Sequence, residues 1–127
     1  MDKETMVIVE ADRIATVVKA LDAYGIEAKV ALWGLFDEYE TWRLILAAPE
    51  FDQVGPLEGY GLLHKALRAA QIDQESLPSF HILRMKDPFI VQLRKIFGKT
   101  KSVEGMRLGG QSFGDRFLEE GYIYRIR

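Results

Sequence analysis

The residues best suited to chemistry are six basic side chains in a segment that holds a single acid, Asp87. Between positions 81 and 101 these bases are Arg84, Lys86, Arg94, Lys95, Lys99 and Lys101. Lysine and arginine side chains gathered on one surface bind phosphate groups, with strong salt dependence. The segment therefore predicts contacts with an anion or a nucleic acid. A second interpretation stays open, because the last bases also suit the C-terminal end of a helix, where cations offset the helix dipole.

No pattern of catalytic or metal-ligating residues accompanies this segment. Gly98-Lys99-Thr100 matches the end of a phosphate-binding loop, but the earlier glycine of that motif is absent and the triplet follows a helix. Neither His64 nor His81 has a second ligand at metal-binding spacing. Glu27 and Lys29 lack the aspartate on a preceding strand that a metal-dependent nuclease requires. The sequence thus predicts no catalytic residue, no cofactor and no metal site, and it leaves open an enzyme whose residues come from distant segments.

Composition and charge are those of an ordinary globular protein. Of 127 residues, 48% are hydrophobic and 28% charged, and cysteine is absent, so we expect one domain spanning residues 1–127 without disulfides. No apolar run has the length of a membrane span or a secretory signal, and the expected location is the cytoplasm. Residues 1–63 hold five bases against twelve acids, whereas residues 64–127 hold twelve against seven. This asymmetry indicates either an anion-binding half or two surfaces of one domain that attract each other.

Hydrophobic spacing and turn residues predict an α+β fold in the order α-β-β-α-β-α-β-β, with a largely antiparallel or mixed sheet packed by about three helices. The predicted helices are 12–24, 56–71 and 88–97, and the predicted strands are 26–36, 41–48, 80–83, 106–113 and 117–126, with an optional strand at Met6–Val9. Asp12 and Asp87 are expected to cap helices, whereas Gly25 and Gly98 are expected to end them, the glycines in a left-handed conformation.

The first predicted hairpin carries apolar side chains on both faces. With Asp37–Glu40 as the loop, one face holds Trp33, Leu35, Trp42 and Leu44 together with Ala31 and Leu46. The other face holds Ile26, Ala28, Val30, Leu32, Phe36, Ile45 and Ala47. If helices cover only one face, the tryptophan face predicts a self-association surface and a two-fold homodimer. If helices cover both faces, the same residues belong to the core.

Several apolar and turn segments resemble those of a group of small bacterial proteins of unknown function. The segments are Thr41–Pro49, Gly55-Pro56, Asp87-Pro88 and Glu120–Arg125. The resemblance covers most of the chain, implies a bacterial and cytoplasmic protein, and transfers no functional residue.

The functional expectation is a non-enzymatic interaction or accessory domain that self-associates. The alternative is an anion- or nucleic-acid-binding module that uses residues 84–101, and the second alternative is an enzyme of unrecognised type. The first expectation depends on the tryptophan face, and the alternative depends on the basic segment.

Overall fold

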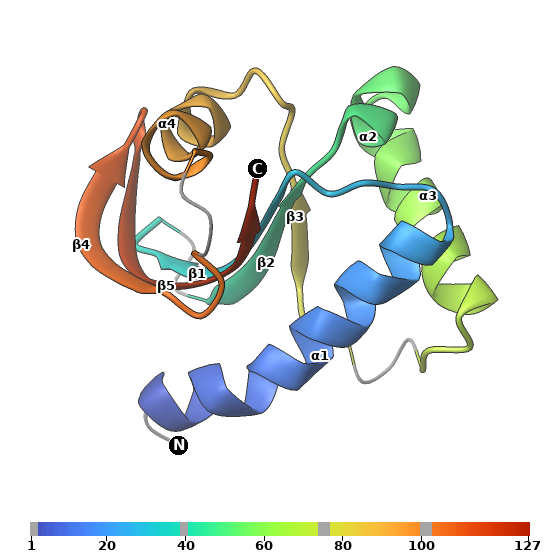
Figure 1. Cartoon of the computed structure of the whole chain (residues 1–127), viewed down its shortest axis with the longest axis horizontal. Helices are drawn as coiled ribbons and strands as arrows, with labels where there is room; N and C mark the ends of the chain where they lie inside the picture. Colours follow the sequence, from blue (N-terminus) through green and yellow to red (C-terminus); the bar gives the residue numbers. More distant parts are fainter. Residues whose placement is uncertain (1–2, 39–40, 74–76, 100–102) are drawn as a thin grey trace.

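Helices and strands follow one another in the predicted α+β order in the computed structural model (Figure 1). The structure describes residues 3–38, 41–73, 77–99 and 103–127. Of residues 3–11 it describes the backbone alone. The helices are α1 (Lys3–Ala23), α2 (Pro49–Val54), α3 (Pro56–Ala69) and α4 (Pro88–Phe97). The strands are β1 (Val30–Phe36), β2 (Trp42–Ala47), β3 (Phe80–Ile82), β4 (Arg107–Phe113) and β5 (Arg116–Ile126).

β1 lies at the centre of a five-stranded mixed sheet with the order β3-β2-β1-β5-β4. It pairs antiparallel with both β2 and β5, whereas β3 runs parallel to β2. The register of the first hairpin is the predicted one, since Leu35 pairs with Trp42 and Trp33 with Leu44. Every residue of β1 is buried. The strand is therefore enclosed on both faces as well as along both edges.

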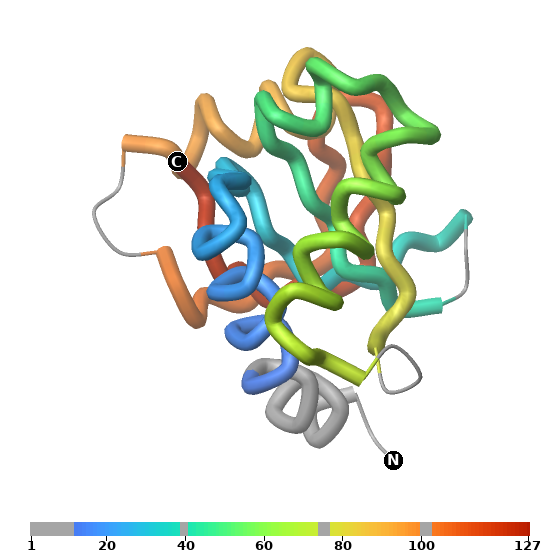
Figure 2. Tube along the Cα trace, turned by 90° about the vertical axis from the view of Figure 1, so that its right-hand side faces the viewer, coloured from blue at the N-terminus to red at the C-terminus, as the bar shows by residue number. Residues whose placement is uncertain are grey.

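Helices cover both faces of the sheet. Helices α1 and α3 lie on one face, while α4 lies on the other, inside the curve of the β4–β5 hairpin (Figures 1 and 2). The side chains of Trp33 and Leu44 pack in the first layer with residues of α1 and α3. Leu32 and Ile45 point the other way and pack with Phe89 and its neighbours on α4. The alternation of the hairpin thus supplies two cores, one on each side of the sheet.

The N-terminal expectations were wrong. Met6–Val9 belongs to α1 and is not a strand, and Asp12 lies inside this helix instead of capping it. The sequence from Lys3 to Ala23 contains neither glycine nor proline, so nothing in it interrupts the backbone hydrogen bonds of a helix. The prediction that Gly25 ends this helix in a left-handed conformation is confirmed, because its φ is +87°.

Three other local predictions differ from the structure. Pro49 ends β2, as expected, but it also begins the short helix α2, as proline at a first helical position does. Ile26 and Ala28 pack in the α1/α3 layer and not in the α4 layer, because β1 begins only at Val30 and the strand alternation does not extend to them. Gly98 follows α4 with φ −64°, a right-handed conformation, so its predicted left-handed cap is wrong.

Two glycines at the C-terminal hairpin share a left-handed conformation but differ in their surroundings. Gly114 has φ +62°, and a Cβ built there would lie 2.5 Å from the carbonyl carbon of Pro88, at the start of α4. Gly110 has φ +63°, and a Cβ built there would meet nothing within 4 Å. Gly114 is therefore the point at which the hairpin approaches the backbone of α4.

Alanine substitutions at these two glycines distinguish the cost of a left-handed backbone from the cost of a close approach to α4. Gly110→Ala should lower the free energy of unfolding by about 1–2 kcal/mol, the cost of a left-handed alanine. Gly114→Ala should lower it by about 1–3 kcal/mol more, because the methyl group must displace α4. Urea denaturation of both variants measures the difference, and equal losses would contradict the close packing of the hairpin on α4.

Candidate functional site

The predicted basic residues are divided between the two ends of α4. Arg84 and Lys86 precede the helix, whereas Arg94 and Lys95 lie in its last turn and Lys99 follows it. Lys101 lies outside the described residues. A helix of this length separates its ends by about 15 Å. The structure therefore brings only the later bases together.

Arg84 belongs to a different environment. It lines a small cavity of about 20 Å³ with Asp52, whose carboxylate accepts a hydrogen bond from the backbone N–H of Met85 at 3.2 Å. A cavity of this volume holds about one water molecule. Arg84 is thus placed beside an acid that fixes the loop before α4, at the opposite end of the helix from Arg94, Lys95 and Lys99.

An open pocket of about 420 Å³ lies at the C-terminal end of α4. Its lining residues are Val91, Arg94, Lys95, Gly98, Lys99 and Arg127. Arg127 is the member that the sequence did not predict, because it follows β5 and lies far from the basic segment along the chain. We call this site the basic pocket.

Hydrogen bonds position the two arginines of the basic pocket. The Nε of Arg94 donates to the backbone oxygen of Arg127 at 2.6 Å. The Nη1 of Arg127 donates to Oε1 of Glu27 at 3.1 Å, and Nζ of Lys29 lies 3.0 Å from the same oxygen. Lys29 first, and then Arg127, holds the pKa of the Glu27 carboxyl below its usual range. The acid beside the pocket is therefore ionised and shared between two cations.

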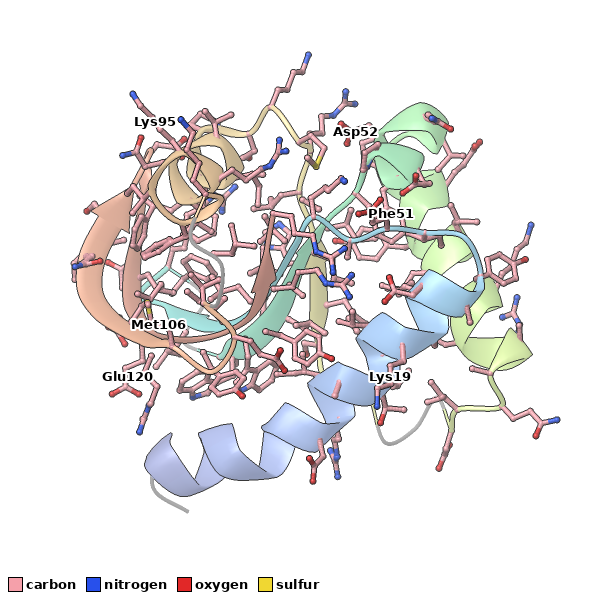
Figure 3. All side chains as sticks on the ribbon, viewed as in Figure 1. Lys19, Phe51, Asp52, Lys95, Met106 and Glu120 are labelled. Atoms are coloured by element: carbon pink, nitrogen blue, oxygen red, sulfur yellow. The ribbon has the colours of Figure 1, made fainter. Side chains whose placement is uncertain are left out.

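The two lysines of the basic pocket are differently placed. Lys95 and Lys99 are exposed, and neither forms an ion pair with any residue that the structure describes. Lys95 projects from α4 in Figure 3. Part of this positive charge offsets the negative end of the helix dipole. The remainder, from a lysine beyond the helix and an arginine after β5, leaves a positive surface that suits an anionic group.

A second polar cluster surrounds the opposite end of α4. Asp87 caps the helix by accepting a hydrogen bond from the backbone N–H of Phe89 at 2.9 Å. The guanidinium of Arg116 lies 3.1 Å from the carboxylate of Glu38 and 3.8 Å from that of Asp87. His81, on β3, shares this environment. The cluster ties the end of the first strand, the start of β5 and the cap of α4 to one another.

The electrostatic surroundings of His81 lower its pKa. Burial is the largest cause, followed by the positive charges of Arg116 and Arg43, while Asp87 and Glu38 act in the opposite direction. The imidazole is therefore neutral at pH 7. The members of this cluster come from separate segments, and for this reason no spacing in the sequence indicated it.

The structure places the predicted self-association residues in the core. Trp33, Leu35 and Leu44 are 4%, 8% and 0% exposed within a single chain, and Trp42 is half-buried. The rings of Trp33 and Trp42 are stacked with centroids 5.7 Å apart. The prediction that these residues share a face is right. Of the two alternatives for that face, the structure has the one in which helices cover both faces of the sheet, because α1 and α3 pack over it.

Comparisons with protein-family models, curated proteins and solved structures find no match. Among the described residues, no group of three or more histidine, aspartate or glutamate side chains is arranged to hold a metal ion. In the same part of the chain, no helix is long and apolar enough to cross a membrane.

The lowered pKa of His81 makes stability depend on pH. The unfolded chain binds a proton at this histidine more readily than the folded chain does, so protonation favours unfolding. The contribution of His81 to the free energy of unfolding should therefore be fully present above pH 6.5, the ordinary pKa of histidine. This contribution should be lost progressively as the pH falls below that value.

Urea denaturation between pH 5 and pH 7.5 measures this decline in the wild type and in the variant His81→Gln. The variant should show a shallower decline, since glutamine does not titrate. Parallel curves for the two proteins would contradict the placement of a neutral His81 among Arg43, Arg116, Asp87 and Glu38.

Proposed function

We propose that the chain is a binding module that holds an anionic, phosphate-bearing ligand in the basic pocket. The observation that carries this proposal is the pocket's lining, which combines four basic side chains with no acidic one. The bases come from α4, the turn that follows it and the residue after β5.

The chemistry of the lining determines how such a ligand is held. Arginine presents a planar fork of N–H donors that matches two oxygens of a phosphate, whereas lysine supplies a compact charge. The backbone carbonyls at the C-terminal end of α4 oppose an anion. The ligand is therefore bound by Arg94, Lys95, Lys99 and Arg127 through their side chains. Binding of this kind is weak at high salt.

The burial of the tryptophan face supports this proposal over self-association through that face. Trp33 and Leu44 already pack against α1 and α3 within one chain. The basic pocket is open to solvent and is lined by the later bases of the segment that the sequence singled out.

Fluorescence anisotropy with a labelled single-stranded oligonucleotide tests the proposal. At about 50 mM salt the wild type should bind, and the logarithm of affinity should fall against the logarithm of salt with a slope of about −3 for four contacts. The double variant Lys95→Glu/Lys99→Glu should bind at least tenfold more weakly. Inorganic pyrophosphate should compete for the same pocket.

A matched control changes the same amount of charge elsewhere. The variant Lys19→Glu/Arg68→Glu alters exposed residues on α1 and α3 that do not line the basic pocket, and it should retain binding within about threefold. Failure of the wild type to bind at 50 mM salt, or equal losses in both double variants, would overturn the proposal.

A further inference from the structure

An acid of the same chain is bonded to one base of the basic pocket. Glu27 lies in the segment between α1 and β1, which passes the C-terminal end of β5 (Figures 1 and 2). Its Oε1 accepts a hydrogen bond from Nη1 of Arg127 at 3.1 Å, and Nζ of Lys29 lies 3.0 Å from this same oxygen. Arg127 lines the basic pocket, whereas Glu27 lies outside its lining. One carboxylate oxygen beside the pocket thus binds one of the pocket's four bases.

Hydrogen bonds of the backbone fix the place where this contact forms. The backbone N–H of Glu27 donates to Oε1 of Glu50 at 3.0 Å. The backbone N–H of Arg127 donates to the carbonyl oxygen of Lys29 at 2.8 Å, and the backbone oxygen of Arg127 accepts from Nε of Arg94. The side chain of Arg127 can therefore turn from one partner to another while its backbone stays in place.

The two cations on Glu27 differ in their exposure to water. The side chain of Arg127 is 53% exposed, whereas that of Lys29 is 27% exposed. An ion pair in full contact with water contributes little to stability, because water screens its charges. Arg127 is therefore the partner that leaves more readily, and Lys29 keeps the carboxylate paired when Arg127 leaves.

A second acid influences Arg127 but has a stronger partner of its own. The charge of Arg127 helps to lower the pKa of Asp22, but a hydrogen bond from Arg125 is the largest cause. Two nitrogens of the Arg125 guanidinium donate to the Asp22 carboxylate at 3.1 and 2.9 Å. Glu27 is thus the acid whose charge is shared with the basic pocket.

We propose that Glu27 is an internal counter-ion of the basic pocket, and that a phosphate-bearing ligand takes its place on Arg127. The oxygens of the ligand accept the N–H groups of Arg127, while Glu27 stays with Lys29. The ionised Glu27 competes for one base and repels the ligand, so it lowers the affinity of the pocket. This inference rests on the proposed function, because it names what limits binding at that same site.

A double-mutant cycle measures the competition as affinity for the labelled oligonucleotide at about 50 mM salt. Glu27→Gln removes the charge and keeps an oxygen that accepts a hydrogen bond. This variant should bind about three- to fivefold more tightly than the wild type, as expected for an exposed ion pair. Arg127→Gln removes the base for which Glu27 competes, and in that background Glu27→Gln should change the affinity by less than about twofold.

A matched control removes one negative charge elsewhere. Glu58 is exposed on α3 and does not line the basic pocket. Glu58→Gln should therefore bind the oligonucleotide as the wild type does, although its net charge equals that of Glu27→Gln.

The carboxyl group of Glu27 reports the exchange of partners directly. Lys29 first, and then Arg127, lowers its pKa. A ligand that takes Arg127 away and adds negative charge should raise this pKa, which carboxyl-carbon NMR measures with and without a saturating oligothymidine. A pKa that stays unchanged in the complex would overturn the inference, because Glu27 would then keep Arg127.

The outcomes are distinct for the two proposals. Glu27→Gln that binds no more tightly than a binding wild type overturns the counter-ion and leaves the proposed function in place. An equal gain in the Arg127→Gln background also overturns it, because the effect is then one of net charge. Binding by Glu27→Gln without binding by the wild type supports the counter-ion and overturns the proposed function of the natural chain. Absence of binding by both proteins overturns both proposals.

Discussion

The burial of β1 on both faces is the constraint on which the rest of the structure depends. The strand Val30–Phe36 contains no polar side chain, and all seven of its residues are buried. Such a strand can lie neither at an edge nor on a half-exposed sheet. It requires a partner strand on each side and a helical layer above and below, and β2, β5, α1, α3 and α4 meet these requirements.

The layer that contains α4 also creates the surfaces that we connect with function. Because the β4–β5 hairpin curves around α4, the helix is held at its N-terminal end by Gly114 and the Asp87 cap. Its other end meets the residue after β5, where Arg127 joins Arg94 in the wall of the basic pocket. The same packing that covers the second face of β1 thus assembles cations from distant parts of the chain.

The fold class and most elements were predictable because hydrophobic periodicity is a local signal. The pairing of Trp33 with Leu44 followed from the loop position alone, since the register of a hairpin depends on its turn. The sequence did not predict in the same way that helices cover both faces of the sheet, because this depends on where the helices cross it. For the same reason the sequence left open whether Trp33 lies on the surface or in the core, and the structure places it in the core.

The candidate site was predictable only in part. Arg94, Lys95 and Lys99 lie within one helix and its end, so their proximity is a property of the sequence. Arg127 joins them only through the closing of the sheet. The polar cluster around His81 is an extreme case of this limit, because it brings together residues of three strands, a turn and a helix cap. Spacing along the chain carries no information about such a meeting.

Native-state hydrogen exchange on β1 tests the central constraint most directly. A strand paired on both edges and covered on both faces should open only when the whole molecule unfolds, so the slowest amides of β1 should report the global free energy of unfolding. The exposed edge strand β4 should exchange through smaller openings with a lower free energy. Amides of β1 that exchange as readily as those of β4 would contradict the account, because the strand would then not be the doubly covered centre of the sheet.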